Sequence, residues 1–148
     1  MFLYGGSHGA FIALHLAGQY PNVFKALVAR NPVTNKATKS QASDIPDNGM
    51  LFNMAYSGDP GPASMPILYN VSPIAYASNI NVPVYFMIGS KDRRVPPSQG
   101  YFLYHDLKGL GRKNVRMNLY DDCHPLFKVL VHSNVMVHAA LFFDEFCK

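Results

Sequence analysis

Short apolar runs, separated by longer mixed segments, mark the strands of this chain. Residues 26–29 and 82–88 are nearly continuous apolar runs, which is the pattern of strands buried on both faces of a sheet. Residues 115–120 alternate between apolar and polar side chains, as a strand nearer the edge of a sheet does. Residues 1–4 have the character of the end of a further strand. The pattern therefore predicts four strands.

Amphipathic segments between these runs predict helices. Apolar residues recur at helical spacing over residues 10–19 and 98–110, and Ser133 can cap a last helix. Residues 34–80 are richer in polar and turn-forming residues, and they predict short helices between turns. The side chains expected to face the core are Tyr101, Tyr104, Leu107 and Leu110 in the second helix and Met136, Val137, Ala140, Leu141 and Phe143 in the third. Strands that alternate with helices predict an α/β fold with a parallel sheet.

The composition is that of a globular chain of one domain. Of the 148 residues, 49% are hydrophobic and 13% aromatic, and this content excludes a disordered chain. Charged residues make up 15%, compared with about 25% in an average globular protein, which suggests that part of the surface faces other protein. The two cysteines, Cys123 and Cys147, are too few for a disulfide scaffold.

Charge and hydropathy favour neither a nucleic-acid partner nor a membrane. The formal net charge is +4, but the lysines and arginines are scattered from Lys25 to Lys148 rather than gathered in one stretch. No uncharged apolar run approaches the roughly 18 residues that a membrane span needs. The apolar residues 10–14 lack the basic segment that precedes the core of a secretory signal. We therefore expect a cytoplasmic protein.

The segment from Gly5 to Gly9 reads Gly-Gly-Ser-His-Gly and matches the pattern G-x-S-x-G. It lies between a predicted strand and a predicted helix, where this pattern forms a tight turn that exposes a serine hydroxyl above the sheet. Glycines on both sides of Ser7 would let the strand and the helix approach closely, and the helix N-terminus adds the positive end of its dipole. In the alternative interpretation, Ser7 only caps the helix.

A carboxylate and a histidine follow later strands in the order serine, acid, histidine, which hydrolases with this turn use. Asp92 follows the third predicted strand and His124 the fourth. Because the carboxyl ends of parallel strands share one edge of a sheet, we expect both to lie near Ser7. His124 would take the serine proton, and Asp92 would hold the imidazole tautomer. Asp121 and Asp122 are rival acids, but they precede His124 on the same loop, which makes the required geometry awkward.

The other histidines and cysteines do not suggest a second centre. Cys123 and His124 are adjacent on an extended segment, so their side chains would point apart, and a metal site would need further ligands. His15, His132 and His138 lie on helical patterns and are expected to be structural or exposed. We therefore predict no metal site.

Four short segments carry a resemblance to a known family. They are GGSHG at 5–9, VARNPV at 28–33, DIPD at 44–47 and DRRVP at 92–96. With these segments, and over essentially its whole length, the chain resembles the acylaminoacyl-peptidase branch of the prolyl oligopeptidase family of serine peptidases. The resemblance implies the α/β-hydrolase fold, here its C-terminal half only. Residues 1–148 would form part of a peptidase catalytic domain, with the family's N-terminal strands and β-propeller absent.

The resemblance also implies a role for each site residue. Ser7 would be the nucleophile, Asp92 the acid and His124 the base, and the backbone N–H of His8 would donate to an oxyanion. Arg94 stands two residues after the acid, where relatives hold a backbone carbonyl of the substrate. The implied reaction releases an N-acylated residue from a peptide terminus through an acyl-enzyme, without a metal or cofactor. The implied partner is a short N-acylated peptide, and the family resemblance also allows a homo-oligomer.

Two other functions fit the same residues. A carboxylesterase would use the same triad, because a fold does not fix its substrate. A truncated gene product would have no catalytic function. For the isolated 148-residue chain we expect poor solubility and little activity. Its first strand would present an unpaired edge, and the family's second oxyanion donor comes from sequence upstream of Ser7.

Overall fold

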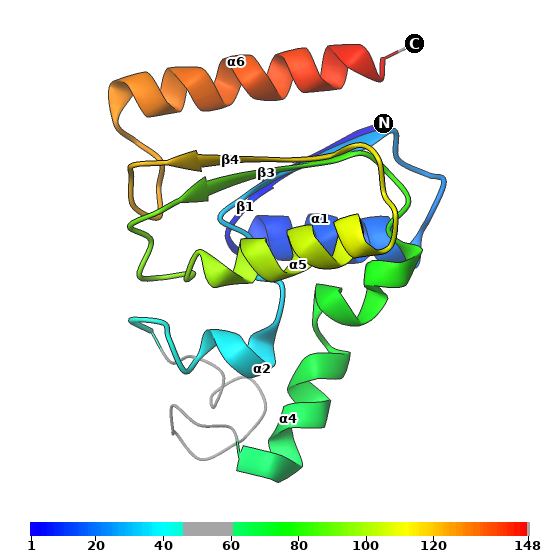
Figure 1. The fold of residues 1–148 in the computed structure, drawn as a ribbon, viewed down its shortest axis with the longest axis vertical. Helices are drawn as coiled ribbons and strands as arrows, with labels where there is room; N and C mark the ends of the chain where they lie inside the picture. The colour runs from blue at the N-terminus through cyan, green and yellow to red at the C-terminus, as the bar shows by residue number, and fades with distance from the viewer. Residues whose placement is uncertain (46–60, 148) are drawn as a thin grey trace.

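The computed structural model describes residues 1–45 and 61–147, which contain one four-stranded sheet with helices on both faces (Figure 1). The strands are parallel and lie in the order β1-β2-β3-β4. Their bounds are β1 Phe2–Gly6, β2 Ala26–Arg30, β3 Val84–Gly89 and β4 Val115–Tyr120. The predicted α/β fold with a parallel sheet is confirmed.

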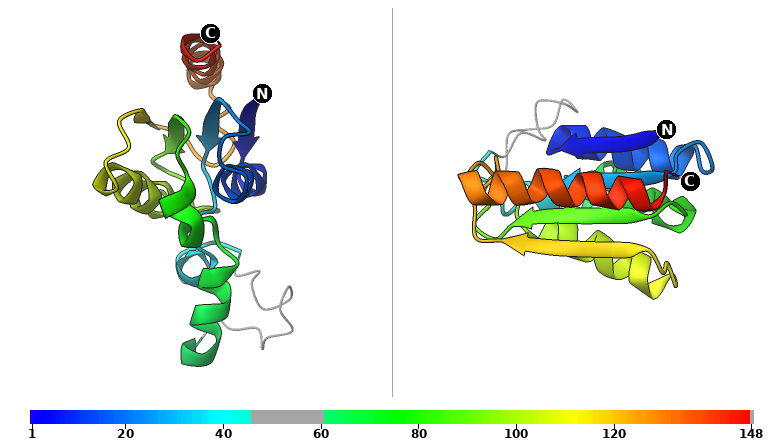
Figure 2. Two further views of the ribbon diagram at one scale, coloured as in Figure 1. Left: turned by 90° about the vertical axis from the view of Figure 1, so that its right-hand side faces the viewer. Right: turned by 90° about the horizontal axis from the view of Figure 1, so that it is seen from above.

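The helices form a layer on each side of the sheet. Helices α1 (His8–Gln19) and α5 (Ser98–Gly109) and the 3₁₀ helix η1 (Pro73–Asn79) lie below the sheet in Figure 1. Helix α6 (Val129–Glu145) lies above it and contacts the two middle strands, as the view from above in Figure 2 shows. Helices α2 (Lys36–Lys39) and α4 (Gly61–Asn70) extend away from the sheet on the side of α1.

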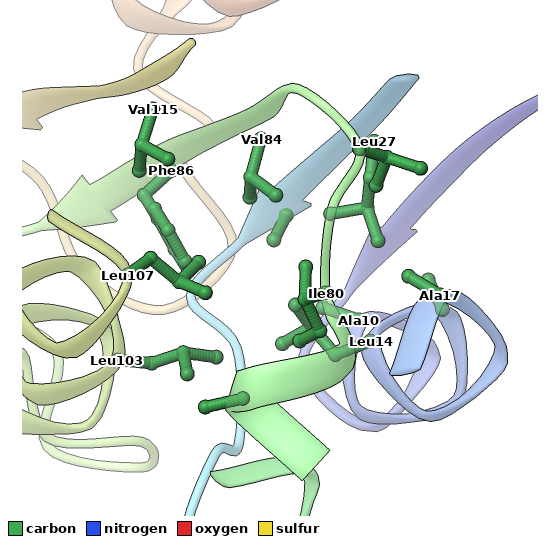
Figure 3. Packing of buried hydrophobic residues seen from close by; sticks show 14 of the residues in the cluster. Ala10, Leu14, Ala17, Leu27, Ile80, Val84, Phe86, Leu103, Leu107 and Val115 are labelled. Atoms are coloured by element: carbon green, nitrogen blue, oxygen red, sulfur yellow. The ribbon is translucent and has the colours of Figure 1, made fainter. Parts of the chain in front are cut away.

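Two cores, one on each face of the sheet, hold these layers together. On the face toward α1 and α5, Leu27 of β2 and Phe86 of β3 pack with the helices (Figure 3). Their neighbours in sequence, Val28 and Tyr85, lie on the opposite face and pack with Phe142 of α6. Successive side chains of a strand point to opposite faces, so strands between two cores need apolar residues at every position. This requirement explains the continuous apolar runs in the sequence.

The prediction for α6 is wrong in its start and in its buried face. The helix begins at Val129, before the predicted cap Ser133, and its cap position is Lys128. The buried side chains are Val135, Ala139 and Phe142, with Phe143 partly buried; those expected inside but exposed are Met136, Val137, Ala140 and Leu141. Apolar residues surround this helix almost completely, so their spacing could not fix which face meets the sheet.

The predicted core face of α5 is confirmed for Leu107 and for Tyr101 and Tyr104, which pack against the core, and it is wrong for Leu110. Leu103 and Leu107 are fully buried, whereas Leu110 lies beyond the last turn and is 48% exposed. A Cβ added to Gly100 would stand 2.4 Å from Cδ1 of Ile88, so the helix lies very close to β3 at this point. This close approach selects the face of Gly100, Leu103 and Leu107, and it leaves the predicted tyrosines only partly buried.

The predicted short helices of residues 34–80 are present as α2, α4 and η1, while residues 46–60 of that range lie outside the described residues.

A buried glutamine, Gln99, anchors the start of this segment. Oε1 of Gln99 accepts hydrogen bonds from the backbone N–H groups of Thr34 and Asn35, and its Nε2 donates to Oγ1 of Thr38. Among residues 1–45 and 61–147, no helix has both the length and the apolar character needed to cross a membrane.

Candidate active site

The carboxyl-terminal edge of the sheet gathers the predicted site residues. Ser7 follows β1 directly, Asp92 lies on the loop after β3, and His124 lies on the loop after β4. Because all four strands run in the same direction, these three loops emerge at one edge. Open parallel sheets bind their ligands at this edge.

Ser7 occupies a strained turn between β1 and α1. Its backbone angles are φ 56° and ψ −121°, a conformation that costs a non-glycine residue about 1–3 kcal/mol. The turn is tied to the sheet, since the Ser7 N–H donates to the carbonyl of Arg30, the last residue of β2, at 2.9 Å. The Ser7 carbonyl accepts from the N–H of Phe11 at 3.2 Å and so begins α1. The Ser7 side chain does not cap the helix, contrary to the alternative interpretation of the motif.

The two glycines that flank this turn have different roles. A Cβ on Gly5 would lie 2.5 Å from the carbonyl carbon and oxygen of Gly9, so β1 and α1 touch through bare backbone. A Cβ on Gly9 would meet no described atom within 4 Å. The expectation that both glycines allow the close approach is therefore correct for Gly5 and wrong for Gly9, which contributes its backbone to the contact.

Asp92 and His124 form a close polar contact at this edge. Oδ2 of Asp92 lies 2.6 Å from Nδ1 of His124, and the Asp92 side chain is fully buried. Oδ1 of Asp92 accepts the backbone N–H groups of Arg94 and Val95, each at 2.9 Å. Both carboxylate oxygens are thereby fixed in direction. An ionised carboxylate can only accept, so a neutral His124 carries its proton on Nδ1 and presents Nε2 as an acceptor.

The structure does not join Ser7 to this pair by a hydrogen bond. Within the described residues, the Ser7 hydroxyl makes no hydrogen bond, and the ring of His124 has its one hydrogen bond to Asp92. Contacts between a nucleophile and its base are often long in a free enzyme and tighten when substrate binds. The geometry thus supplies an oriented acid–histidine pair and a separate exposed turn at the same edge.

The two rival acids have other partners. Asp121 is exposed, and its carboxylate pairs with Lys91 and Lys128. Asp122 is buried, and its carboxylate accepts the N–H groups of Cys123 and Lys128, which shapes the loop before and after His124. Burial raises the pKa of the Asp122 carboxyl, but these donors outweigh it and hold that pKa below its ordinary value. Neither carboxylate contacts the imidazole.

Arg94 borders a cavity of about 270 Å³ next to His124, lined also by Asp44, Lys91, Arg93, Cys123 and Pro125. Its Nε donates to Oδ1 of Asp44 at 2.8 Å, which fixes one edge of the guanidinium. The segment of Asp44 is itself bound to the acid loop, because Ser43 Oγ donates to the carbonyl of Arg94. Sequence reasoning placed Asp44 in a family motif without a role; the following residues Pro46 and Asp47 lie outside the described residues.

A larger cavity of about 500 Å³ lies along α1, on the side of His8, Phe11 and His15.

His15 lies on a helix, as predicted, and its ring contacts the carbonyl of Val71 and the amide of Gln19. Burial lowers the pKa of His15, and the nearby His8 and Lys36 lower it further. His124 and Arg94 border the smaller cavity, whereas His8 lines the larger one. In the described part of the chain, no three His, Cys, Asp or Glu side chains are arranged to hold a metal.

The pattern of strands and the turn at Ser7 are those of an α/β-hydrolase. The model of the "Prolyl oligopeptidase family" matches residues 1–145. The acylamino-acid-releasing enzyme of Sus scrofa is 41% identical over 143 residues, which cover 94% of this chain and 19% of that protein. The Arabidopsis thaliana enzyme of the same name is 35% identical over 150 residues, or 97% of this chain and 19% of that protein.

A solved structure agrees with the sequence comparison. The acylaminoacyl peptidase of Pyrococcus horikoshii superposes with a TM-score of 0.69 at 26% identity, covering 83% of this chain and 19% of that chain. The chain belongs to the prolyl oligopeptidase family of serine peptidases. It spans about a fifth of the length of the curated relatives that it matches.

Proposed function

We propose that this chain carries the catalytic residues of a serine peptidase that releases N-acylated residues from peptide termini, and that residues 1–148 are part of its catalytic domain. Ser7 is the nucleophile, His124 the general base and Asp92 the acid that holds His124. The observation that carries the proposal is the 2.6 Å contact between Asp92 and His124, at the sheet edge that also presents the strained turn of Ser7.

The reaction proceeds in two halves through an ester of Ser7. In the first, Oγ of Ser7 attacks the carbonyl carbon of the scissile bond while Nε2 of His124 accepts the hydroxyl proton. The C–N bond then breaks, and the leaving amine takes that proton from His124. In the second, His124 removes a proton from water, the water oxygen attacks the ester, and the proton returns to Oγ. The products are an N-acylated residue and a peptide with a free amino terminus.

Asp92 acts in both halves without giving up its negative charge. Two backbone N–H groups hold Oδ1, so Oδ2 stays directed at Nδ1 of His124. This arrangement keeps Nε2 available as the base and stabilises the imidazolium that forms when it takes a proton. The backbone N–H of His8, at the first residue of α1, donates to the developing oxyanion, and the dipole of that helix favours the negative charge.

The relatives and the cavity beside His124 support the choice of substrate. The similar proteins of Sus scrofa and Arabidopsis thaliana are named acylamino-acid-releasing enzymes, which points to a short peptide with an acylated amino terminus. Arg94 lines the cavity with its Nε bound to Asp44, so its terminal nitrogens are the part of the guanidinium that can donate to a substrate carbonyl. Asp44 thereby sets the direction of the Arg94 side chain.

The test is hydrolysis of an N-acetylalanine anilide and of a simple aryl ester by the natural, full-length gene product. We expect cleavage of the anilide. This activity should disappear in Ser7→Ala and persist in Ser133→Ala, which removes an exposed serine of α6. Cleavage of the ester without the anilide would indicate a carboxylesterase, and failure to cleave either substrate would overturn the proposal.

A further inference from the structure

Two consecutive residues at the end of β2 contact the loop that carries His124. Nδ2 of Asn31 donates to the carbonyl of His124 at 2.7 Å, and Nη2 of Arg30 donates to the carbonyl of Pro125 at 3.1 Å. Two neighbouring carbonyls of the histidine loop are therefore attached to the middle of the sheet. We call Arg30 and Asn31 the β2 clamp.

The same two side chains also reach the strands that deliver the other site residues. Oδ1 of Asn31 accepts the N–H of Gly89, the last residue of β3, at 2.7 Å. Nη1 of Arg30 donates to the hydroxyl of Tyr4 on β1 at 3.0 Å. The clamp thus connects the histidine loop to the strand before Asp92 and to the strand before Ser7.

The backbone is strained where this connection is made. Consecutive residues of a strand point to opposite faces, yet both side chains of the clamp reach one loop. Asn31 achieves this with φ 39°, in the left-handed region that asparagine enters more readily than most residues. Its side chain is almost completely buried, and one amide there supplies both a donor and an acceptor. An aspartate of the same shape would instead direct an oxygen at the His124 carbonyl.

The packing around the clamp leaves the histidine loop little freedom. A Cβ on Gly89 would lie 2.7 Å from the carbonyl oxygen of Asp122 and 2.8 Å from that of Cys123, so the end of β3 touches the histidine loop directly. A displacement of about 1 Å in a catalytic group costs on the order of 100-fold in rate. Small shifts of this loop therefore matter for the reaction.

We propose that the β2 clamp is a positioning device for His124, which sets the place of the imidazole relative to Ser7 without touching substrate. This inference rests on the proposed function, because it assigns a role within the same triad. It makes Asn31 and Arg30 positioning residues. Their loss should lower the rate of chemistry at each folded site while leaving substrate binding unchanged.

The test compares Asn31→Asp with a matched control, Asn35→Ala, in the natural full-length protein. Asn35 caps α2 through Oδ1 and the N–H of Ala37, so its loss perturbs a hydrogen-bonded turn away from His124. The readouts are the rate constant of fluorophosphonate labelling per labelled chain, and kcat and KM for the anilide. We expect Asn31→Asp to lower the labelling rate and kcat about 10- to 100-fold with KM unchanged. Asn35→Ala should keep both at the wild-type level.

A second pair keeps the test decisive if Asn31→Asp folds poorly. Arg30→Lys retains the charge but replaces the two guanidinium nitrogens that reach Tyr4 and Pro125 separately by a single ammonium nitrogen. The control, Arg116→Lys, alters an exposed pair with Glu145 elsewhere on the sheet. A lower rate per site in Arg30→Lys alone supports the clamp. Wild-type rates per labelled site in both clamp variants, or a loss expressed only in KM, would overturn it. Wild-type protein that is not labelled at Ser7 would refute the proposed function instead.

Discussion

Gly5→Ala is the substitution that should damage the serine turn most directly. The new Cβ would lie 2.5 Å from both carbonyl atoms of Gly9 and 2.7 Å from the nitrogen of Ala10. Carbon atoms in good contact are about 3.5–4.0 Å apart, so the first turn of α1 must move by about 1 Å. The obstacle is backbone, which cannot rotate away as a side chain can. We expect a loss of about 1–3 kcal/mol of folding free energy, as for other overpacked sites.

The displacement should also affect the site, because Ser7 lies between the two touching segments. A movement of about 1 Å at a nucleophile costs on the order of 100-fold in rate. The matched control is Gly9→Ala, whose Cβ meets no described atom within 4 Å and which replaces a helical glycine. That change should leave labelling intact and stabilise α1 by up to about 1 kcal/mol.

The assay measures the midpoint of thermal unfolding and the rate of fluorophosphonate labelling in the natural protein. A loss of 1 kcal/mol lowers the midpoint by about 2–4 °C for a domain of 150–250 residues. Gly5→Ala should therefore melt clearly lower than Gly9→Ala and react more slowly with the probe. Wild-type melting and labelling in Gly5→Ala, or equal losses in the two variants, would show that the contact between Gly5 and Gly9 does not hold the serine turn in place.

Further predictions concern the carboxylates and Arg94. Asp92→Asn should lower kcat about 10⁴-fold with the fold intact by circular dichroism, because it stabilises the wrong imidazole tautomer, whereas Asp121→Asn should be nearly silent. Arg94→Ala should cost about 1.5–3 kcal/mol of transition-state binding with peptide substrates and much less with a short ester; equal losses in kcat/KM would indicate a structural role. Asp44→Asn should also lower kcat/KM more for peptide substrates than for the short ester, but by a smaller factor than Arg94→Ala. The N–H donors that lower the pKa of Asp122 stabilise the folded state when this carboxyl is ionised, above about pH 3.9. This stabilisation is lost as the pH falls through the lower pKa of the folded state. The gap in urea stability between wild type and Asp122→Asn should therefore close in acid, and a gap that persists there would contradict this assignment.

The parts of the site that follow from local pattern could be predicted from the sequence. Two buried strands appear as apolar runs, and their parallel order requires that the loops after β1, β3 and β4 share one edge. This is sufficient to bring Asp92 near His124. The serine turn has its own short motif. The sequence could not show, however, that a side chain at Gly5 would clash with α1 whereas one at Gly9 would not.

The contacts between segments that are far apart in the sequence could not be predicted. Asn31 contacts Gly89 and His124 across long stretches of sequence, and only its place before Pro32 at the end of a buried strand marks it as unusual. Asp44 and Arg94 are also far apart in the sequence, and no local pattern predicts that they pair. The face of α6 was missed because its apolar residues occur on nearly all sides of the helix, so their spacing gives little periodic signal.

The role of Ser7 as nucleophile is tested by locating the fluorophosphonate adduct in the natural protein by peptide mass spectrometry. We expect a single adduct on the peptide that contains Ser7, complete loss of labelling in Ser7→Ala, and strongly slowed labelling in Asp92→Asn. An adduct on another serine, or labelling that survives Ser7→Ala, would contradict the assignment of Ser7, Asp92 and His124.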